Sequence, residues 1–175
     1  STSWYQGKKV TCFGDSITAQ ATWIYQLYHY FGLSSIVNCG IGGTTVSNNG
    51  SMIEDENGNS VESWMCSDYR ISTIPSDSDV ILIFGGHNDW CTEVEGFTIG
   101  ELNSSFTLSD STYMGAYALM IKKLITNFPN AKLIGLTPVG GRTNTNANQD
   151  NQMYLKNGCM YDFAEATKKV LAYYG

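Results

Sequence analysis

The sequence has few charged residues, only two histidines and no long apolar run, and each shortage excludes a class of protein. Ten basic residues are scattered along the chain and outnumbered by sixteen acidic ones, which gives a net charge of −6 and a pI near 4.7. Nucleic acids and anionic membrane surfaces bind clustered Lys and Arg, so neither is expected as a partner. No apolar stretch approaches the roughly 18 to 20 residues that span a bilayer.

The cysteines do not form the pattern of a metal site. All five are spaced irregularly, none forms a C-x-x-C pair, and no neighbouring histidine completes a zinc site. We therefore expect no metal and no cofactor. Cys12 and Cys39 fall in strand-like apolar runs and are expected to be buried. Cys66 and Cys91 lie near expected loops, where an oxidising compartment would allow them to pair. The loops are rich in Ser, Thr, Asn and Gly, which favours a secreted or surface-associated protein.

Length and composition indicate one domain over residues 1–175, because 42% hydrophobic residues can fill one core. Apolar runs that read as strands alternate with segments of helical spacing. The expected strands are 9–13, 36–39, 80–84 and 133–137, and the expected helices are 22–31, 61–69, 110–128 and 163–174. This alternation predicts the α/β class: a parallel sheet of four strands, covered on both faces, with ligands at the carboxyl ends of the strands.

Residues that suit a nucleophilic site follow the expected strands. Ser16 comes directly after the first strand, where a nucleophile would lie, and the glycines of 40–43 follow the second strand. Asn88 follows the third strand, so the same edge of the sheet should carry all of them. Each has a structural alternative: Ser16 as a helix N-cap, Asn88 as a turn residue and Gly43 as the pivot of a tight turn. Asp15 is expected to order its loop.

In these motifs and in their order, the chain resembles the SGNH hydrolases, also called GDSL-type esterases and lipases, over nearly its whole length. Residues 14–16 are similar to the family's nucleophile motif, Gly43 to its second-block glycine and residues 86–89 to its G-x-N-D motif. The resemblance implies a flavodoxin-like three-layer α/β/α sandwich and Ser16 as nucleophile. It also implies an oxyanion hole made by the N–H groups of Ser16 and Gly43 and the Asn88 amide, each donor contributing about 3 to 4 kcal/mol.

The family's D-x-x-H motif, which supplies the general base and its orienting acid, does not occur in the sequence. In relatives it follows a fifth strand after the final helix, so we expect the chain to be shortened at its carboxyl end. A missing segment or a second chain would then supply Asp and His. His29 lies on the order of 20 Å from Ser16 along its helix and is excluded as the base. His87, beside Asn88, is a candidate for catalysis or substrate contact, or else a loop histidine.

The expected substrate is an O-acetylated carbohydrate. Trp64, Trp90, Tyr69 and the polar segment 140–151 are expected on the rim of the crevice, where aromatic rings beside hydroxyl-rich loops suit sugar faces. The alternative for both tryptophans is packing in the core. Two other functions stay open: a lysophospholipase or thioesterase, and a non-catalytic carbohydrate-binding or structural module that kept the fold and lost the dyad. Asp89 is expected to order its loop.

Overall fold

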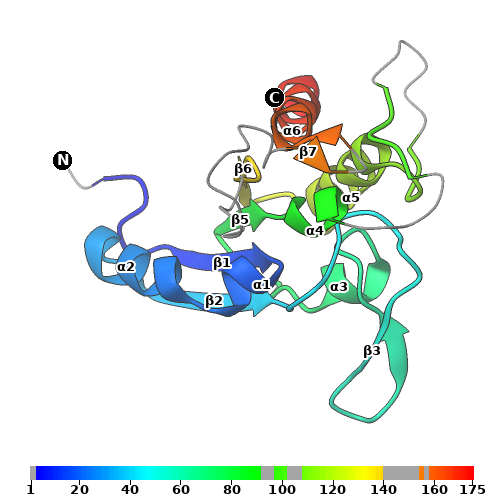
Figure 1. Ribbon diagram of the computed structural model, residues 1–175. Helices are drawn as coiled ribbons and strands as arrows, with labels where there is room; N and C mark the ends of the chain where they lie inside the picture. Colours follow the sequence, from blue (N-terminus) through cyan, green and yellow to red (C-terminus); the bar gives the residue numbers. More distant parts are fainter. Residues whose placement is uncertain (1–2, 92–96, 102–107, 140–153, 156–157) are drawn as a thin grey trace, which may run out of the picture.

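The centre of the protein is a parallel sheet. The computed structural model describes residues 3–91, 97–101, 108–139, 154–155 and 158–175. Within them the main sheet has four strands in the order β2-β1-β5-β6 (Figure 1). They are β1 (Lys9–Gly14), β2 (Ser35–Gly40), β5 (Val80–Phe84) and β6 (Lys132–Leu136). The predicted α/β class, with its four-stranded parallel sheet, is confirmed.

The register of the strands aligns their carboxyl ends. Gly14 of β1 pairs with Gly40 of β2 on one side and with Phe84 of β5 on the other, and Phe84 pairs with Leu136 of β6. All four strands therefore end at the same end of the sheet, and the segments that follow them meet there. Among the described strands, β2 and β6 form the two outer edges of the sheet.

Helices cover both faces, which gives the predicted three-layer arrangement (Figure 1). The long elements are α2 (Thr22–Phe31), α5 (Tyr113–Asn127) and α6 (Met160–Tyr174), and the short ones are α1 (Ser16–Ala19), α3 (Asp68–Ser72) and α4 (His87–Cys91). On one face Val10, Cys12 and Val80 pack against Ile24 of α2. On the other face the core includes residues from α3, α5 and α6. Alternate residues of β1 and β5 thus enter two different cores.

Local signals set the ends of α2 where the sequence predicts them and those of α5 within three residues of the predicted ones. α2 ends at Gly32, whose φ of 57° lies in the left-handed region that glycine adopts without strain. α5 begins after Thr112, whose hydroxyl accepts the Gly115 N–H at 3.2 Å. It ends just before Pro129, which cannot continue a helix.

The helix predicted over 61–69 is wrong. Residues 52–54 form β3 (Met52–Glu54), which pairs antiparallel with β4 (Ser60–Glu62), and α3 begins only after its cap, Ser67. The turn between the strands explains the difference, because the Asp55 carboxylate accepts the N–H groups of Asn57 and Asn59 and closes a hairpin. A second hairpin, β7 (Tyr154–Leu155) with β8 (Gly158–Cys159), was also not predicted.

The predicted pairing of Cys66 with Cys91 is not found. Both are free thiols, as are Cys12 and Cys39, because Cys66 is buried in the main core whereas Cys91 is exposed on α4. Burial raises the pKa of Cys12 and Cys66 to about 12, so both remain protonated at neutral pH. Within the described part of the chain, no helix has the length and apolar character to cross a bilayer.

The docking of α6 on α5 can be tested through Phe163, which is fully buried and packs on the Tyr113 ring at 4.9 Å between centroids. Phe163→Ala should lower the free energy of unfolding by about 3 to 5 kcal/mol, because it leaves a cavity between the helices. Tyr161→Ala, at an exposed position of the same helix, should change it by no more than about 0.5 kcal/mol. Equal urea midpoints for the two variants would contradict this packing.

Candidate active site

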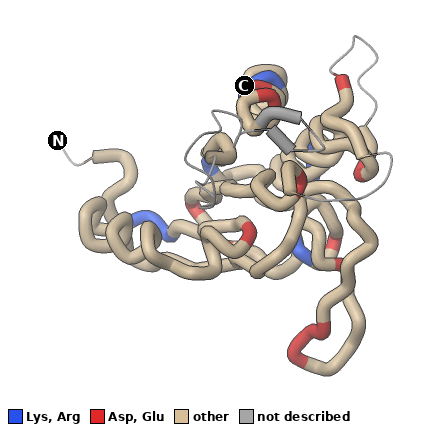
Figure 2. Tube along the Cα trace, viewed as in Figure 1, with Lys and Arg blue, Asp and Glu red and all other residues tan. Residues whose placement is uncertain are grey.

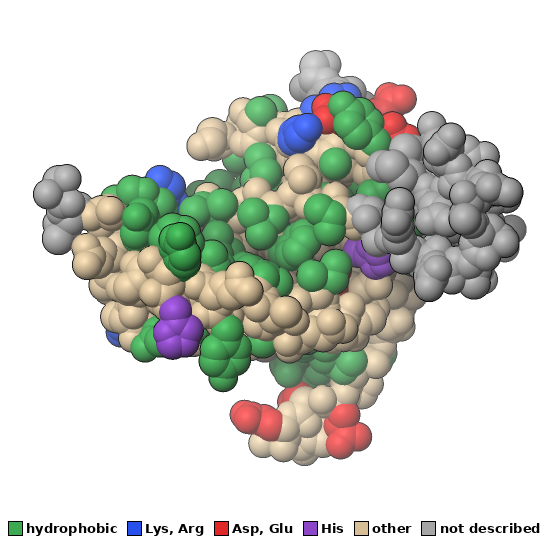
Figure 3. Space-filling model, turned by 60° about the vertical axis from the view of Figure 1, so that its left-hand side comes forward, with side chains coloured by type: hydrophobic (Ala, Val, Ile, Leu, Met, Phe, Trp, Pro, Cys, Tyr) green, Lys and Arg blue, Asp and Glu red, His purple; other side chains and the backbone are tan. Residues whose placement is uncertain are grey.

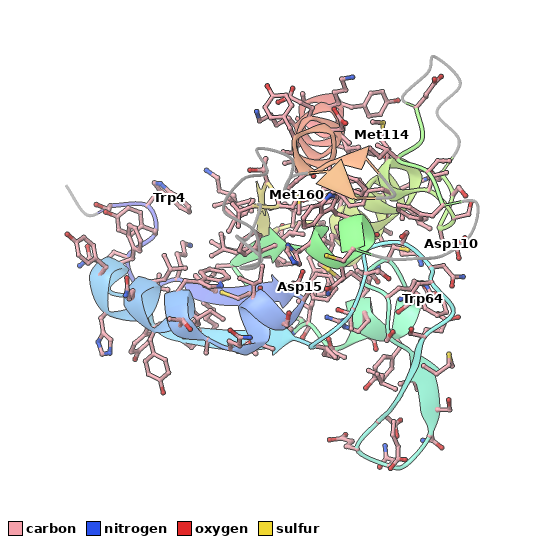
Figure 4. The ribbon with its side chains drawn as sticks, viewed as in Figure 1. Trp4, Asp15, Trp64, Asp110, Met114 and Met160 are labelled. Carbon is pink, nitrogen blue, oxygen red and sulfur yellow. The ribbon has the colours of Figure 1, made fainter. Side chains whose placement is uncertain are left out.

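Ser16 lies at the carboxyl edge of the sheet as the first residue of α1. The cap of α1 is Asp15, whose Oδ1 accepts the Ile17 N–H at 2.9 Å, so Ser16 is not the cap and its hydroxyl has no capping role. Asp15 is buried where β1 ends (Figure 4), whereas Ser16 is half-buried. No described residue accepts or donates a hydrogen bond at the Ser16 hydroxyl.

The loop that follows β2 and contains Gly42 and Gly43, here called the glycine loop, runs beside Ser16. A Cβ on Gly42 would lie 3.9 Å from the Ser16 Cβ, and the Ile41 N–H donates to the Gly14 carbonyl at 3.1 Å. Gly43 has a φ of +74° and open space around its Cβ position, so glycine is needed there for the backbone conformation and not for room. Like the Ser16 N–H, the Gly43 N–H donates to no described residue.

Asn88 reaches the same loop from β5. It belongs to α4, so the backbone at 87–91 is helical. Its Nδ2 donates to the Thr44 carbonyl at 2.8 Å. An amide nitrogen carries two hydrogens, which leaves one donor of Asn88 for another acceptor. Gly86, between β5 and α4, has a φ of +113° and passes so close to Tyr113 that any Cβ would collide with its hydroxyl.

Asp89 fixes the far end of the glycine loop, as predicted for a carboxylate that orders its loop. It is fully buried, and its two oxygens accept the N–H groups of Val46 at 2.8 Å and Ser47 at 2.9 Å and the Ser47 hydroxyl. Burial raises the pKa of Asp89 to about 6, while the hydrogen bonds from Ser47 and Val46 oppose that rise. The carboxylate thereby joins β5 and α4 to the loop that contains Gly43.

Arg70, which the sequence analysis did not single out, holds the near end of the loop. Its fully buried guanidinium donates to the carbonyls of Gly14 at 2.9 Å and Cys39 at 3.1 Å, where β1 and β2 end, and to the Thr44 hydroxyl at 3.0 Å. It also donates to the Ser63 carbonyl at 2.7 Å. Burial lowers the pKa of Arg70 to about 10, so the group is still charged at neutral pH. One charged side chain thus connects two strand ends and the loop.

His87 is half-buried at this edge but does not hydrogen-bond to Ser16. Its Nε2 lies 3.7 Å from the Cys91 sulfur, its ring packs edge-on against Trp90, and its buried Nδ1 has no partner among the described residues. Burial raises the pKa of Asp15, while the Ile17 N–H and the charge of His87 act against that rise. A role for His87 in catalysis or substrate contact therefore stays a prediction.

Trp64 and Trp90 do not line the rim of a crevice. Trp64 is 7% exposed and Trp90 is 1% exposed, and both belong to the main hydrophobic core. The rim prediction is wrong, and the alternative of core packing is correct, because both side chains fill space between the sheet and its helices. Figure 4 shows Trp64 near α3 and away from Asp15. Tyr69 is half-buried, and the predicted rim segment 140–151 lies outside the described residues.

The carboxyl end of the sheet therefore brings together one hydroxyl and several N–H donors that have no partner among the described residues. The Ser16 hydroxyl, the N–H groups of Ser16 and Gly43 and the second amide hydrogen of Asn88 come from three strand ends that Arg70 and Asp89 hold together. Donors arranged in this way suit a negatively charged oxygen. Among the described residues, no cluster of three His, Cys, Asp or Glu side chains lies close enough to bind a metal ion.

Comparison with known proteins extends these observations. A family model described as GDSL-like Lipase/Acylhydrolase matches residues 1–161. A solved structure from Lactobacillus plantarum is 22% identical with a TM-score of 0.73, covering 97% of this chain and 74% of that one. A possible lipase from Chitinophaga pinensis is 19% identical with a TM-score of 0.68, covering 95% of this chain and 65% of that one. An acetyl xylan esterase is 18% identical with a TM-score of 0.54, covering 94% of this chain and 72% of that one. At identities this low, the structural similarity shows a shared fold and no more. No curated protein gives a significant match.

The buried position of Asp89 predicts a pH dependence of stability. Because burial raises the pKa of Asp89 to about 6, the folded protein keeps, between pH 4 and 6, a proton that the unfolded chain has lost. Ionising Asp89 therefore removes stability as the pH rises through this window. Relative to Asp89→Asn, which cannot ionise, the wild type should lose on the order of 2 kcal/mol of unfolding free energy between pH 4 and pH 6.5. Urea unfolding measures this difference, and a constant value across the window would contradict it.

Proposed function

Because the chain belongs to the GDSL-like lipase/acylhydrolase family, whose model matches residues 1–161, we propose that it is a serine esterase that hydrolyses carboxylic esters. The observation that supports this most strongly is the convergence of the Ser16 hydroxyl with donors that have no partner among the described residues. These are the N–H groups of Ser16 and Gly43 and the second amide hydrogen of Asn88. The proposed nucleophile is Ser16, and the proposed oxyanion hole consists of these three donors.

The proposed reaction follows from the chemistry of a hydroxyl nucleophile. The Ser16 Oγ forms a bond to the acyl carbon and gives its proton to a base, and the carbonyl oxygen becomes an oxyanion held by the three donors. The tetrahedral intermediate then breaks the bond to the alcohol oxygen, which takes the proton from the base. Water attacks the acyl-serine in the same way, releases the carboxylic acid and restores Ser16.

The general base is the part that the sequence does not supply. D-x-x-H is absent, His29 is exposed on α2, and no histidine nitrogen among the described residues hydrogen-bonds to Ser16. A serine of ordinary pKa is a poor nucleophile without a base. We propose that a histidine and its orienting Asp come from a second chain or from a segment beyond these 175 residues.

The proposed substrate is an O-acetyl group on carbohydrate. It is supported by the polar, weakly charged composition and by the shared fold with an acetyl xylan esterase. A long acyl chain is less well supported. The apolar cavity of about 210 Å³ has Val10 and Val80 in its lining, which stand at the amino ends of β1 and β5. That cavity therefore lies at the end of the sheet opposite Ser16.

One observation favours a second candidate, a non-catalytic carbohydrate-binding or structural module of the same fold. The Ser16 hydroxyl has no base among the described residues, and such a module would not need one. The two candidates differ in whether Ser16 reacts when a base is provided from solution.

Added imidazole distinguishes them. Hydrolysis of p-nitrophenyl acetate should be slow with the wild-type chain and should rise with imidazole concentration by more than it rises with Ser16→Ala. Imidazole attacks the ester itself, and the variant measures that background. The difference between the two proteins is the part of the rate that passes through Ser16. Equal rates at every imidazole concentration would contradict the esterase and favour the non-catalytic module.

The oxyanion role of Asn88 is tested by Asn88→Ala under the same conditions. Loss of one oxyanion donor should lower the Ser16-dependent kcat by about 10² to 10³. The control is Asn59→Ala, in the exposed turn of the β3–β4 hairpin, which should keep its activity. Because Asn88 also binds the Thr44 carbonyl, the thermal midpoint of each variant is recorded. A loss of activity that appears only with a loss of folded protein would contradict an oxyanion role.

A further inference from the structure

A long stretch of the chain carries no ionic charge. Between Asp15 and Glu54 the sequence has no Asp, Glu, Lys or Arg, and this stretch forms α1, α2 and β2. In Figure 2 the tube of these three elements is tan throughout. The same stretch is rich in aromatic residues, among them Tyr25, Tyr28 and Tyr30 of α2. A surface built from it can bind neutral groups but offers no counter-ion to a charged ligand.

This uncharged surface contains a groove between α2 and the edge strand β2. The groove has a volume of about 450 Å³ and is lined by Tyr25, Tyr28, Ser34, Ser35 and Asn38 above a floor that includes Ile24. Its volume lies within the range of about 300 to 1,000 Å³ that is common for ligand sites. Figure 3 shows the face of the molecule that includes α2, with charged side chains mostly at its margins.

The side chains of the groove are available to a ligand. Tyr25 is 70% exposed and Tyr28 is 37% exposed, and their spacing of three residues places both rings on one side of α2. The hydroxyls of Ser34 and Ser35 make no hydrogen bond to any described residue. Aromatic faces flanked by free hydroxyls match a sugar ring, which has an apolar face and a rim of hydroxyl groups.

We propose that this groove binds a neutral polysaccharide chain, with sugar rings stacked on Tyr25 and Tyr28 and their hydroxyls bonded to Ser34 and Ser35. The inference rests on the proposed function, since it names a second contact with the same substrate. The groove excludes acidic polymers as preferred ligands, because no described Lys or Arg lines it.

The position of the groove connects it to Ser16. At one end, the Asn38 Nδ2 donates to the carbonyls of Thr18 at 3.0 Å and Ala19 at 3.3 Å. These residues belong to α1, whose first residue is Ser16 and whose length is about 6 Å. A polysaccharide that lies in the groove therefore passes within one short helix of the proposed nucleophile, so an acetylated unit farther along it can reach Ser16.

Binding is measured separately from hydrolysis by placing every variant in a Ser16→Ala background. The probes are unsubstituted xylan and glucomannan, embedded in native gels that slow a protein in proportion to its affinity. Tyr25→Ala and Tyr28→Ala should each weaken binding about fivefold to tenfold, because each removes a stacking surface. Tyr25→Phe keeps the ring and should keep most of the affinity. Urea unfolding confirms that each variant is folded.

Tyr30→Ala is the matched control. Tyr30 is 89% exposed on the same helix but does not line the groove, so its loss should leave binding unchanged. In proteins that retain Ser16, the imidazole-dependent hydrolysis of p-nitrophenyl acetate should be the same for all four tyrosine variants, because this small ester does not reach the groove. Absence of that hydrolysis would contradict the proposed esterase without changing the binding result.

Three results would overturn the proposal. The first is the absence of binding to both polysaccharides by the Ser16→Ala protein. The second is a loss of binding in Tyr30→Ala as large as in Tyr25→Ala or Tyr28→Ala. The third is a dimer in analytical ultracentrifugation that Tyr25→Ala and Tyr28→Ala convert to a monomer, which would identify the groove and the β2 edge as an interface between two copies.

Discussion

The rest of the structure depends on the buried guanidinium of Arg70. It donates to backbone carbonyls at the ends of β1 and β2 and to Thr44, so it fixes the distance between the turn that carries Ser16 and the loop that carries Gly43. Placing a charge in a core is costly unless its donors find acceptors, and the four bonded acceptors of Arg70, together with the Phe13 ring 5.1 Å away, offset that cost. A smaller or uncharged side chain cannot join these strand ends at once.

Asp89 complements Arg70 from the opposite side of the loop. Arg70 donates to the Cys39 carbonyl just before the loop and to the Thr44 hydroxyl within it, and Asp89 accepts the N–H groups of Val46 and Ser47. The loop is thus fixed at both ends by buried charges of opposite sign, and the Gly43 N–H between them has no partner among the described residues. Pre-organisation of this kind is what an oxyanion requires, because donors that are already in place need no rearrangement when charge develops.

The sequence predicted the elements whose pattern is local and missed those that depend on tertiary contacts. Apolar runs such as 80–84 defined the strands, and glycine and proline marked the ends of helices 22–31 and 110–128 closely. Valine and methionine at helical spacing in 61–69 were misleading, because the Asp55 turn pairs β3 with β4. The buried role of Arg70 could not be predicted, because a single arginine in a short helix forms no sequence pattern. The burial of Trp90 could not be predicted either, because it depends on the packing of residues distant in the sequence.

The central claim is that Ser16, Gly43 and Asn88 form one site around a developing oxyanion. The most direct measurement is a crystal structure of the chain after reaction with diethyl p-nitrophenyl phosphate in the presence of imidazole. The expected result is a phosphoryl group on the Ser16 Oγ, with its oxygen about 3 Å from the Ser16 N, the Gly43 N and the Asn88 Nδ2. An adduct on another residue, or a phosphoryl oxygen directed away from these three nitrogens, would contradict the claim.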